Sequence, residues 1–159
     1  VKEAGVQGFT EPDPKIDLSG VDVARKILIL IRESGYQFDI EDIANRSFLP
    51  AECLATTNNE DFFKSLIKNA AHFENLLAEA KAKDCRLKYV ATFENGKASV
   101  GLEFIPKESP FYNLEGKDNI VQFYTDRYID QPLLIKGAGA GAAVTASGIF
   151  ADVIRIGNI

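Results

Sequence analysis

The sequence contains few of the residues that build metal centres or disulfide frameworks. Its 159 residues include two cysteines and one histidine, and neither methionine nor tryptophan. Cys53 and Cys85 are far apart in the chain without CxxC spacing, and His72 has no second imidazole with which to share a zinc ion. We therefore expect both cysteines to be reduced core thiols and the chain to hold no metal.

Long apolar runs and an excess of basic charge are also absent. The longest apolar run, Ile27 to Ile31, is far too short to span a bilayer, and the first residues lack the pattern of a signal peptide. With a net charge of -5, the chain has no electrostatic surface for nucleic acid or an anionic membrane. We expect a cytoplasmic protein with neither partner. Because the chain begins with valine and has no methionine, we also expect that it was processed or excised from a longer one.

Composition and local patterns indicate a folded chain that begins with a loop and two helices. A content of 46% hydrophobic and 26% charged residues is typical of a soluble globular domain. Residues 7–20 hold two prolines and two glycines, which predicts an irregular loop. Ser19 and Asp22 fit a capping box ahead of a helix that Gly35 would end. A second helix is predicted from Asn58 or Asn59 to about Asp84.

The rest of the sequence favours strands and one closing helix. Residues 87–105 alternate in polarity around Asn95-Gly96, a dipeptide favoured in two-residue hairpin turns. Strand-like runs follow at 120–126 and 132–136, and an apolar helix is predicted over 142–156. This order predicts an α+β fold with helices packed on a mainly antiparallel or mixed sheet.

The first candidate site is a group of carboxylates followed by a lysine. Asp22 and Lys26 are four residues apart, so on a helix their side chains share one face. In one interpretation they are a helix cap and its solvated partner. In the other, several carboxylates bind an ammonium group, and a partly buried lysine acts as acid and base in turn. Both interpretations fit the same residues, which are Glu11, Asp13, Asp17, Asp22 and Lys26.

The second candidate site is the glycine-rich turn from Gly137 to Gly141. Glycines between a strand and a helix let the backbone approach a ligand, and a helix N-terminus favours anionic groups. The spacing of Gly137, Gly139 and Ala142 imitates a dinucleotide fingerprint, but that fingerprint needs a second strand and an acidic residue further on. The alternative is that small residues simply permit close helix packing.

Three segments together resemble the homoserine dehydrogenase family. FTEPDPKIDLSGVDVARK, residues 9–26, resembles the family signature YTEPDPRDDLxGxDVARK. GAGAGAAVTASGIFADVIRI, residues 137–156, is similar to the family's closing segment, and LPAE at 49–52 also fits. The departures from the signature are Phe9, Lys15 and Ile16.

The resemblance implies an activity and a role for each matching residue. The family interconverts aspartate 4-semialdehyde and homoserine with NAD or NADP, a step towards threonine and methionine. Lys26 would then be the proton donor and acceptor at the substrate oxygen, and Asp22 would orient that lysine or the substrate hydroxyl. The remaining roles implied are substrate binding by Glu11 and Asp17, and cofactor binding by Gly139 and Gly141.

The same resemblance implies a division of labour within a larger enzyme. Residues 1–136 would be the catalytic, substrate-binding and dimerisation domain, and residues 137–159 a helix that returns to an NAD(P)-binding domain. Since the family places its Rossmann domain upstream, we expect this chain alone to be inactive and to self-associate as a homo-oligomer. Its ending is more similar to the bifunctional aspartokinase branch. The alternative is a non-catalytic amino-acid-binding or oligomerisation module.

Overall fold

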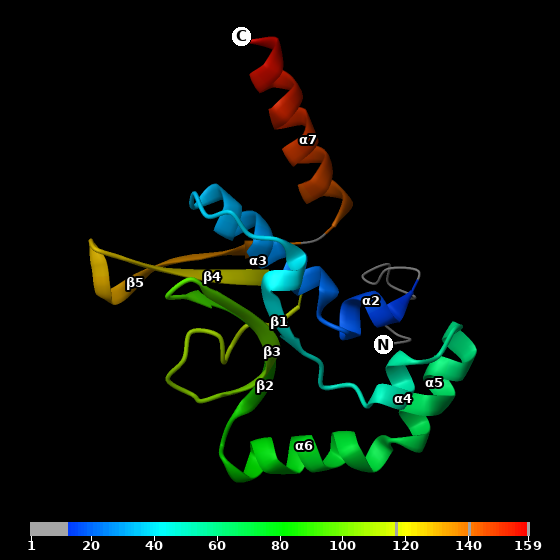
Figure 1. The fold of residues 1–159 in the computed structure, drawn as a ribbon. Helices are drawn as coiled ribbons and strands as arrows, with labels where there is room; N and C mark the ends of the chain where they lie inside the picture. Colours follow the sequence, from blue (N-terminus) through cyan, green and yellow to red (C-terminus); the bar gives the residue numbers. More distant parts are fainter. Residues whose placement is uncertain (1–12, 117, 140, 159) are drawn as a thin grey trace. The chain divides into compact units, whose positions relative to one another are not determined.

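The computed structural model describes residues 13–116, 118–139 and 141–158. The chain divides into two compact units between Tyr112 and Asn113 (Figure 1). This structural boundary precedes the functional boundary that we expect at residue 137. The functional division stays a prediction.

The first unit is built on a three-stranded sheet in the order β1-β3-β2. Strands β2 (Arg86–Glu94) and β3 (Lys97–Ile105) form an antiparallel hairpin, and β1 (Ile43–Arg46) pairs with β3 in parallel. The turn residues Asn95 and Gly96 have φ of 50° and 72°, which confirms the predicted hairpin. The α+β fold with a mixed sheet is confirmed as well, although β1 was not predicted.

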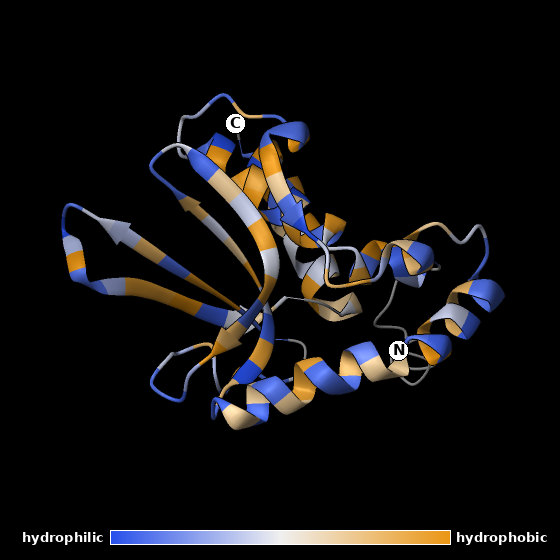
Figure 2. Ribbon diagram, turned by 60° about the horizontal axis from the view of Figure 1, so that its bottom comes forward, coloured by the Kyte–Doolittle hydropathy of each residue, from blue (hydrophilic) through white to orange (hydrophobic). Residues whose placement is uncertain are grey.

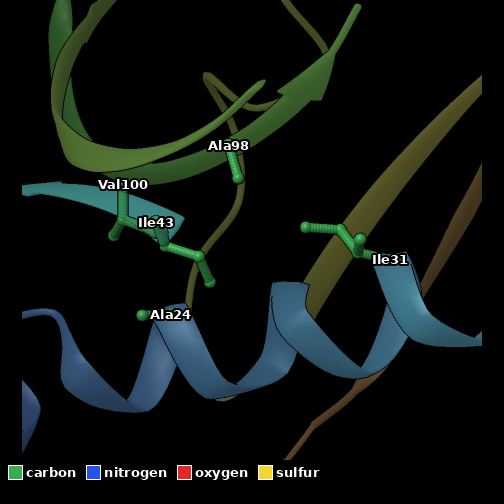
Figure 3. Packing of buried hydrophobic residues seen from close by; sticks show 5 residues of the cluster. All are labelled: Ala24, Ile31, Ile43, Ala98 and Val100. Carbon is green, nitrogen blue, oxygen red and sulfur yellow. The ribbon is translucent and has the colours of Figure 1, made fainter. Parts of the chain in front are cut away.

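Helix α3 (Val21–Glu33) packs on this sheet and supplies one side of the main core. It ends as predicted, since Gly35 follows with φ of 90°. The core exists because alternate residues of β1 and β3 point towards the apolar face of α3. Figure 3 shows the buried side chains of this cluster, which are Ala24, Ile31, Ile43, Ala98 and Val100.

A second core cluster lies among the remaining helices of the first unit. These are the helices α2 (Pro14–Leu18), α4 (Ala51–Leu54), α5 (Asn59–Lys68) and α6 (Ala70–Ala82). The buried residues of this cluster are Leu49, Cys53 and Phe62. The short 3₁₀ helix η1 (Ile40–Asp42) precedes β1 and contacts α3 instead.

Two details of this helical region differ from the sequence prediction. The single helix expected from Asn58 to about Asp84 breaks at Asn69, whose ψ of 19° departs from helical geometry. Both cysteines are free thiols as expected, but only Cys53 is buried, and Cys85 is partly exposed. Cys85 follows the end of α6, where the chain leaves the helix for β2, so it does not reach the core.

The second unit contains a hairpin and a helix. Strands β4 (Asp118–Thr125) and β5 (Tyr128–Ala138) pair antiparallel, and α7 (Ala142–Gly157) follows, all as predicted in kind. Orange, hydrophobic stretches run along the strands and helices of both units in Figure 2. Among the described residues, no helix has the length and apolar character needed to cross a bilayer.

The hairpin turn between β2 and β3 gives a direct test of the fold. Gly96 has positive φ and open space around it, so replacement by alanine adds backbone strain without a steric clash. We expect Gly96→Ala to lower the free energy of unfolding by about 1 kcal/mol. Asparagine tolerates this conformation better, so Gly96→Asn should lose less. Denaturant titration measures both, and an unchanged stability for Gly96→Ala would contradict the turn geometry.

Candidate functional site

The segment that precedes α3 is a short helix, so the predicted irregular loop is wrong over residues 14–18. Asp13 is the N-cap of α2, and its Oδ1 accepts a hydrogen bond from the Lys15 amide at 3.0 Å. Pro14 occupies the first helical turn, where its missing N–H costs nothing, and it is buried. Cap and proline together start the helix that carries Asp17.

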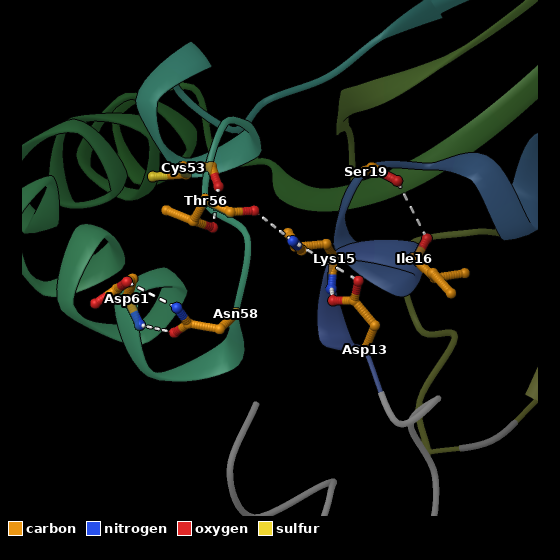
Figure 4. Close-up of polar contacts among 8 residues, drawn as sticks. All are labelled: Asp13, Lys15, Ile16, Ser19, Cys53, Thr56, Asn58 and Asp61. Atoms are coloured by element: carbon orange, nitrogen blue, oxygen red, sulfur yellow. Dashed lines mark hydrogen bonds and ion pairs between the residues drawn. The ribbon is translucent and has the colours of Figure 1, made fainter.

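Lys15 ties α2 to the segment between α4 and α5. Its Nζ donates to the Thr56 carbonyl oxygen at 2.6 Å and lies 3.8 Å from the Asp13 carboxylate, with only 18% of its side chain exposed. The Thr56 hydroxyl in turn donates to the Cys53 carbonyl oxygen at 2.8 Å, as Figure 4 shows. The Lys15 side chain therefore holds α2 against the segment between α4 and α5 and is largely shielded from solvent.

The two-residue turn Ser19-Gly20 joins α2 to α3. Gly20 is the N-cap of α3 with φ of 82°, and no side chain caps the helix there. The Ser19 hydroxyl instead donates to the Ile16 carbonyl oxygen at 3.3 Å, so the predicted capping box of Ser19 with Asp22 is wrong. The reason is that the turn needs a left-handed residue, which moves the cap position to the glycine.

Asp22 and Lys26 form an ion pair on the first two turns of α3, 2.8 Å apart. Their side chains are 42% and 52% exposed. The carboxylate lies in the first turn, where the helix dipole favours negative charge. The described residues do not bury Lys26, so any burial has to come from a bound molecule or from another part of the protein.

The structure brings three of the predicted site residues onto consecutive helices. Asp17 lies on α2, partly buried and with interactions inside the chain, and Asp22 and Lys26 follow on α3. Glu11 lies outside the described residues.

Gly139 and Gly141 belong to the second unit. A Cβ at Gly139 would lie 1.7 Å from the Asn119 side-chain nitrogen, so a larger residue there would displace the Asn119 side chain of β4. Gly141 is the N-cap of α7 with φ of 122° and ψ of 145°, a conformation open mainly to glycine, and no side chain caps the helix. Gly139 therefore fits the packing alternative, whereas Gly141 leaves the first turn of α7 uncapped.

Sequence reasoning missed two residues beside the turn, Asn45 and Tyr89. Asn45 lies on β1, a strand that the sequence pattern did not reveal. Tyr89 belongs to a correctly predicted strand, but nothing in its alternation distinguishes it from an ordinary core aromatic. Only the pairing of β1, β3 and β2 brings the two side chains together.

The described residues contain neither a metal cluster nor a dinucleotide fold. No group of three or more potential ligands occurs among them. Their only parallel strand pair is β1 with β3, without the repeated strand, turn and helix that a dinucleotide-binding fold needs. The site is therefore a charged, half-open surface on α2 and α3.

Comparison with known proteins gives a consistent match. The family model described as homoserine dehydrogenase matches residues 1–154. The chloroplastic bifunctional aspartokinase/homoserine dehydrogenase 2 of Arabidopsis thaliana is 44% identical over 160 residues, covering 99% of this chain and 18% of that protein. The homoserine dehydrogenase of Paracoccidioides brasiliensis is 41% identical, covering 98% of this chain and 43% of that protein.

A solved structure shares the fold. The crystal structure of a Candida auris protein of unknown function matches with a TM-score of 0.87 and 38% identity, covering 99% of this chain and 44% of that one. The chain thus spans less than half the length of each of these three proteins.

The exposure of the ion pair on α3 leads to a prediction about stability. Since half-exposed i,i+4 pairs contribute little, we expect Lys26→Ala to change the free energy of unfolding by less than about 0.5 kcal/mol. Lys64→Ala is the matched control, because Lys64 makes the same kind of pair with Glu60 on α5 at 2.7 Å. Thermal or denaturant unfolding measures both. A loss at Lys26 well above that at Lys64 would mean that the pair holds the fold.

Proposed function

The chain belongs to the homoserine dehydrogenase family, and from that premise we propose that it forms the substrate-binding part of an enzyme. This part binds aspartate 4-semialdehyde or homoserine and exchanges a proton with the substrate oxygen when one is converted into the other. The observation that carries this proposal is the ion pair of Asp22 and Lys26. It lies within the segment that resembles the family signature, and about half of it is exposed. A charged pair that contributes little to stability and is exposed to solvent is accessible to a ligand.

Lys26 is the proposed acid and base. In the direction of semialdehyde reduction its ammonium group donates a proton to the carbonyl oxygen, which becomes the hydroxyl of homoserine. In the reverse direction the amine takes this proton back. Asp22, at 2.8 Å, orients Nζ and supports its charge.

Two carboxylates of the same signature segment are proposed to bind the amino-acid end of the substrate. Glu11 and Asp17 would hold its ammonium group, which is present and unchanged on both sides of the reaction. Support for Asp17 comes from its position on α2, one short turn before α3. The role of Glu11 rests on the family signature alone.

Hydride transfer would need a nicotinamide nucleotide, and we propose that NAD or NADP is held mainly by a domain outside the described fold. The described residues lack a dinucleotide fold, so the chain alone is expected to be inactive. Gly139 and Gly141 are the proposed contacts to the cofactor. The uncapped N-terminus of α7 after Gly141 supports this role for Gly141. At Gly139 the Asn119 side chain lies on the side where a Cβ would be, so a ligand would contact the backbone atoms of this glycine.

Apolar side chains on the second unit support the proposed homo-oligomer. An exposed apolar surface of this extent is usually covered in the assembled protein. The exposed apolar residues are Ile129, Leu133, Leu134 and Ile135 on β5, and Val144, Ile149, Phe150, Val153, Ile154 and Ile156 on α7.

A cytoplasmic location stays a prediction, and the Arabidopsis relative is named as chloroplastic.

Replacement of Lys26 tests the proposed chemistry. In the complete enzyme that carries this chain, we expect Lys26→Ala to lower kcat by about 10²-fold or more, the range of a lost general acid and base. Lys64→Ala removes an exposed lysine from another i,i+4 helical pair and should leave kcat unchanged. Homoserine-dependent reduction of the nicotinamide is followed by absorbance. Near-normal turnover of Lys26→Ala would remove this residue from the mechanism.

Replacement of the carboxylates tests substrate binding separately. Glu11→Gln and Asp17→Asn should raise the KM for homoserine more than they lower kcat, because an ammonium group is bound equally in ground and transition states. Steady-state kinetics at fixed cofactor concentration gives both constants. If neither variant changed KM, the ammonium-binding role would have to be assigned to other residues.

A further inference from the structure

We propose that Asn45 and Tyr89 are positioning residues of this site, which hold the Ser19-Gly20 turn and thereby fix where α3 presents Asp22 and Lys26. This inference rests on the proposed function of Lys26. Neither residue belongs to the segment that resembles the family signature. Both come from strands of the sheet that lie beneath the turn.

The stronger contact is that of Asn45. Its side-chain Nδ2 donates to the Ser19 carbonyl oxygen at 2.8 Å, across 26 residues of sequence. This carbonyl belongs to the residue that ends α2 and precedes the N-cap of α3. A single hydrogen bond thus connects the junction of the two helices to β1.

The Tyr89 hydroxyl is a second donor at the turn, and two acceptor oxygens lie near it. The hydroxyl lies 3.3 Å from Oδ1 of Asn45 and 3.4 Å from the Ser19 carbonyl oxygen, both longer than an ordinary hydroxyl bond. By donating to Oδ1 it selects the amide orientation that points Nδ2 at Ser19. Burial raises the pKa of Tyr89, so the hydroxyl stays protonated and remains a donor.

The shape of the turn matches the tyrosine closely. Gly20 is buried, and a Cβ there would lie 2.3 Å from the Tyr89 hydroxyl oxygen. The ring is held from another side by Phe48, with centroids 5.9 Å apart in an edge-on arrangement. The turn therefore packs directly against the Tyr89 side chain.

This contact affects function through the position of α3. Helix α2 is held by the bond from Lys15 to Thr56 and α3 by the core, so a shift at the turn changes the backbone between them and the position of the first turn of α3 relative to Asp17. Asp22 follows Gly20 by two residues, and Lys26 lies one helical turn later. Because a displacement of about 1 Å in a reacting group can cost about 10²-fold in rate, a small change at the turn is enough to lower turnover.

The test uses near-isosteric variants in the complete enzyme. Asn45→Asp keeps the size of the side chain but removes its donor, and we expect kcat to fall about 10-fold or more. Tyr89→Phe removes only a weakly bound hydroxyl, so a loss of about three-fold is expected. The KM for the nicotinamide nucleotide should stay unchanged in both.

The same changes are then made in the Lys26→Ala background to separate positioning from general damage. If Asn45 acts through Lys26, then Asn45→Asp lowers kcat much less once the lysine is gone. An equal loss in both backgrounds would assign the residue a merely structural role and overturn the proposal. Turnover by Lys26→Ala at the level of the unchanged enzyme would instead reject the proposed function itself.

Matched controls exist elsewhere in the first unit. Asn69→Asp also removes an amide donor to a backbone carbonyl, that of Ser65 at 2.9 Å. Tyr36→Phe also removes a hydroxyl from a tyrosine that packs edge-on against a phenylalanine, Phe93 at 4.8 Å. Both should retain normal kcat.

Circular dichroism establishes which variants fold. Folded Asn45→Asp with normal kcat would overturn the proposal. If Asn45→Asp does not fold, Tyr89→Phe decides, because normal turnover of that folded variant would also overturn it.

Discussion

The Ser19 carbonyl oxygen is the point on which the candidate site depends. It accepts a hydrogen bond from Asn45 on β1 and faces the hydroxyl of Tyr89 on β2, so both outer strands of the sheet meet the turn between α2 and α3. The adjoining glycine is buried and left-handed, which lets the chain pass this close to the tyrosine. The backbone that leads into Asp22 and Lys26 is thereby held in place by the sheet.

Charge and burial are divided between the two faces of α3. Ala24 and Ile31 are buried in the core, while Asp22 and Lys26 remain about half exposed on the same helix. An exposed pair contributes little to stability, and the core does not need it. The fold can therefore tolerate changes at these charges, which makes loss of activity a clean indicator of their role.

Local sequence chemistry accounts for the elements that were predicted correctly. Asn95-Gly96 adopts the positive φ values of a hairpin turn, Gly35 follows the end of α3, and Asn58 caps α5 through its bond from the Asp61 amide at 2.9 Å. The elements that were missed depend on distant partners. Strand β1 is four residues long with one buried side chain and forms because β3 lies beside it. Helix α2 has a local start in Asp13 and Pro14 but is only five residues long, and the long-range bond from Lys15 to Thr56 holds it in place.

The sequence by itself determined the fold class and the family, because periodicity and the signature segment are local patterns. It also determined that Asp22 and Lys26 share a helix face, since a spacing of four residues requires it. Tertiary structure alone decided that Ser19 does not cap α3, that Lys26 is not buried by the described residues, and that the Asn119 side chain lies against Gly139. It also brought Asn45 and Tyr89, 44 residues apart, to one carbonyl oxygen. Contacts of this kind depend on which strands pair, and strand pairing is fixed only when the whole sheet has formed.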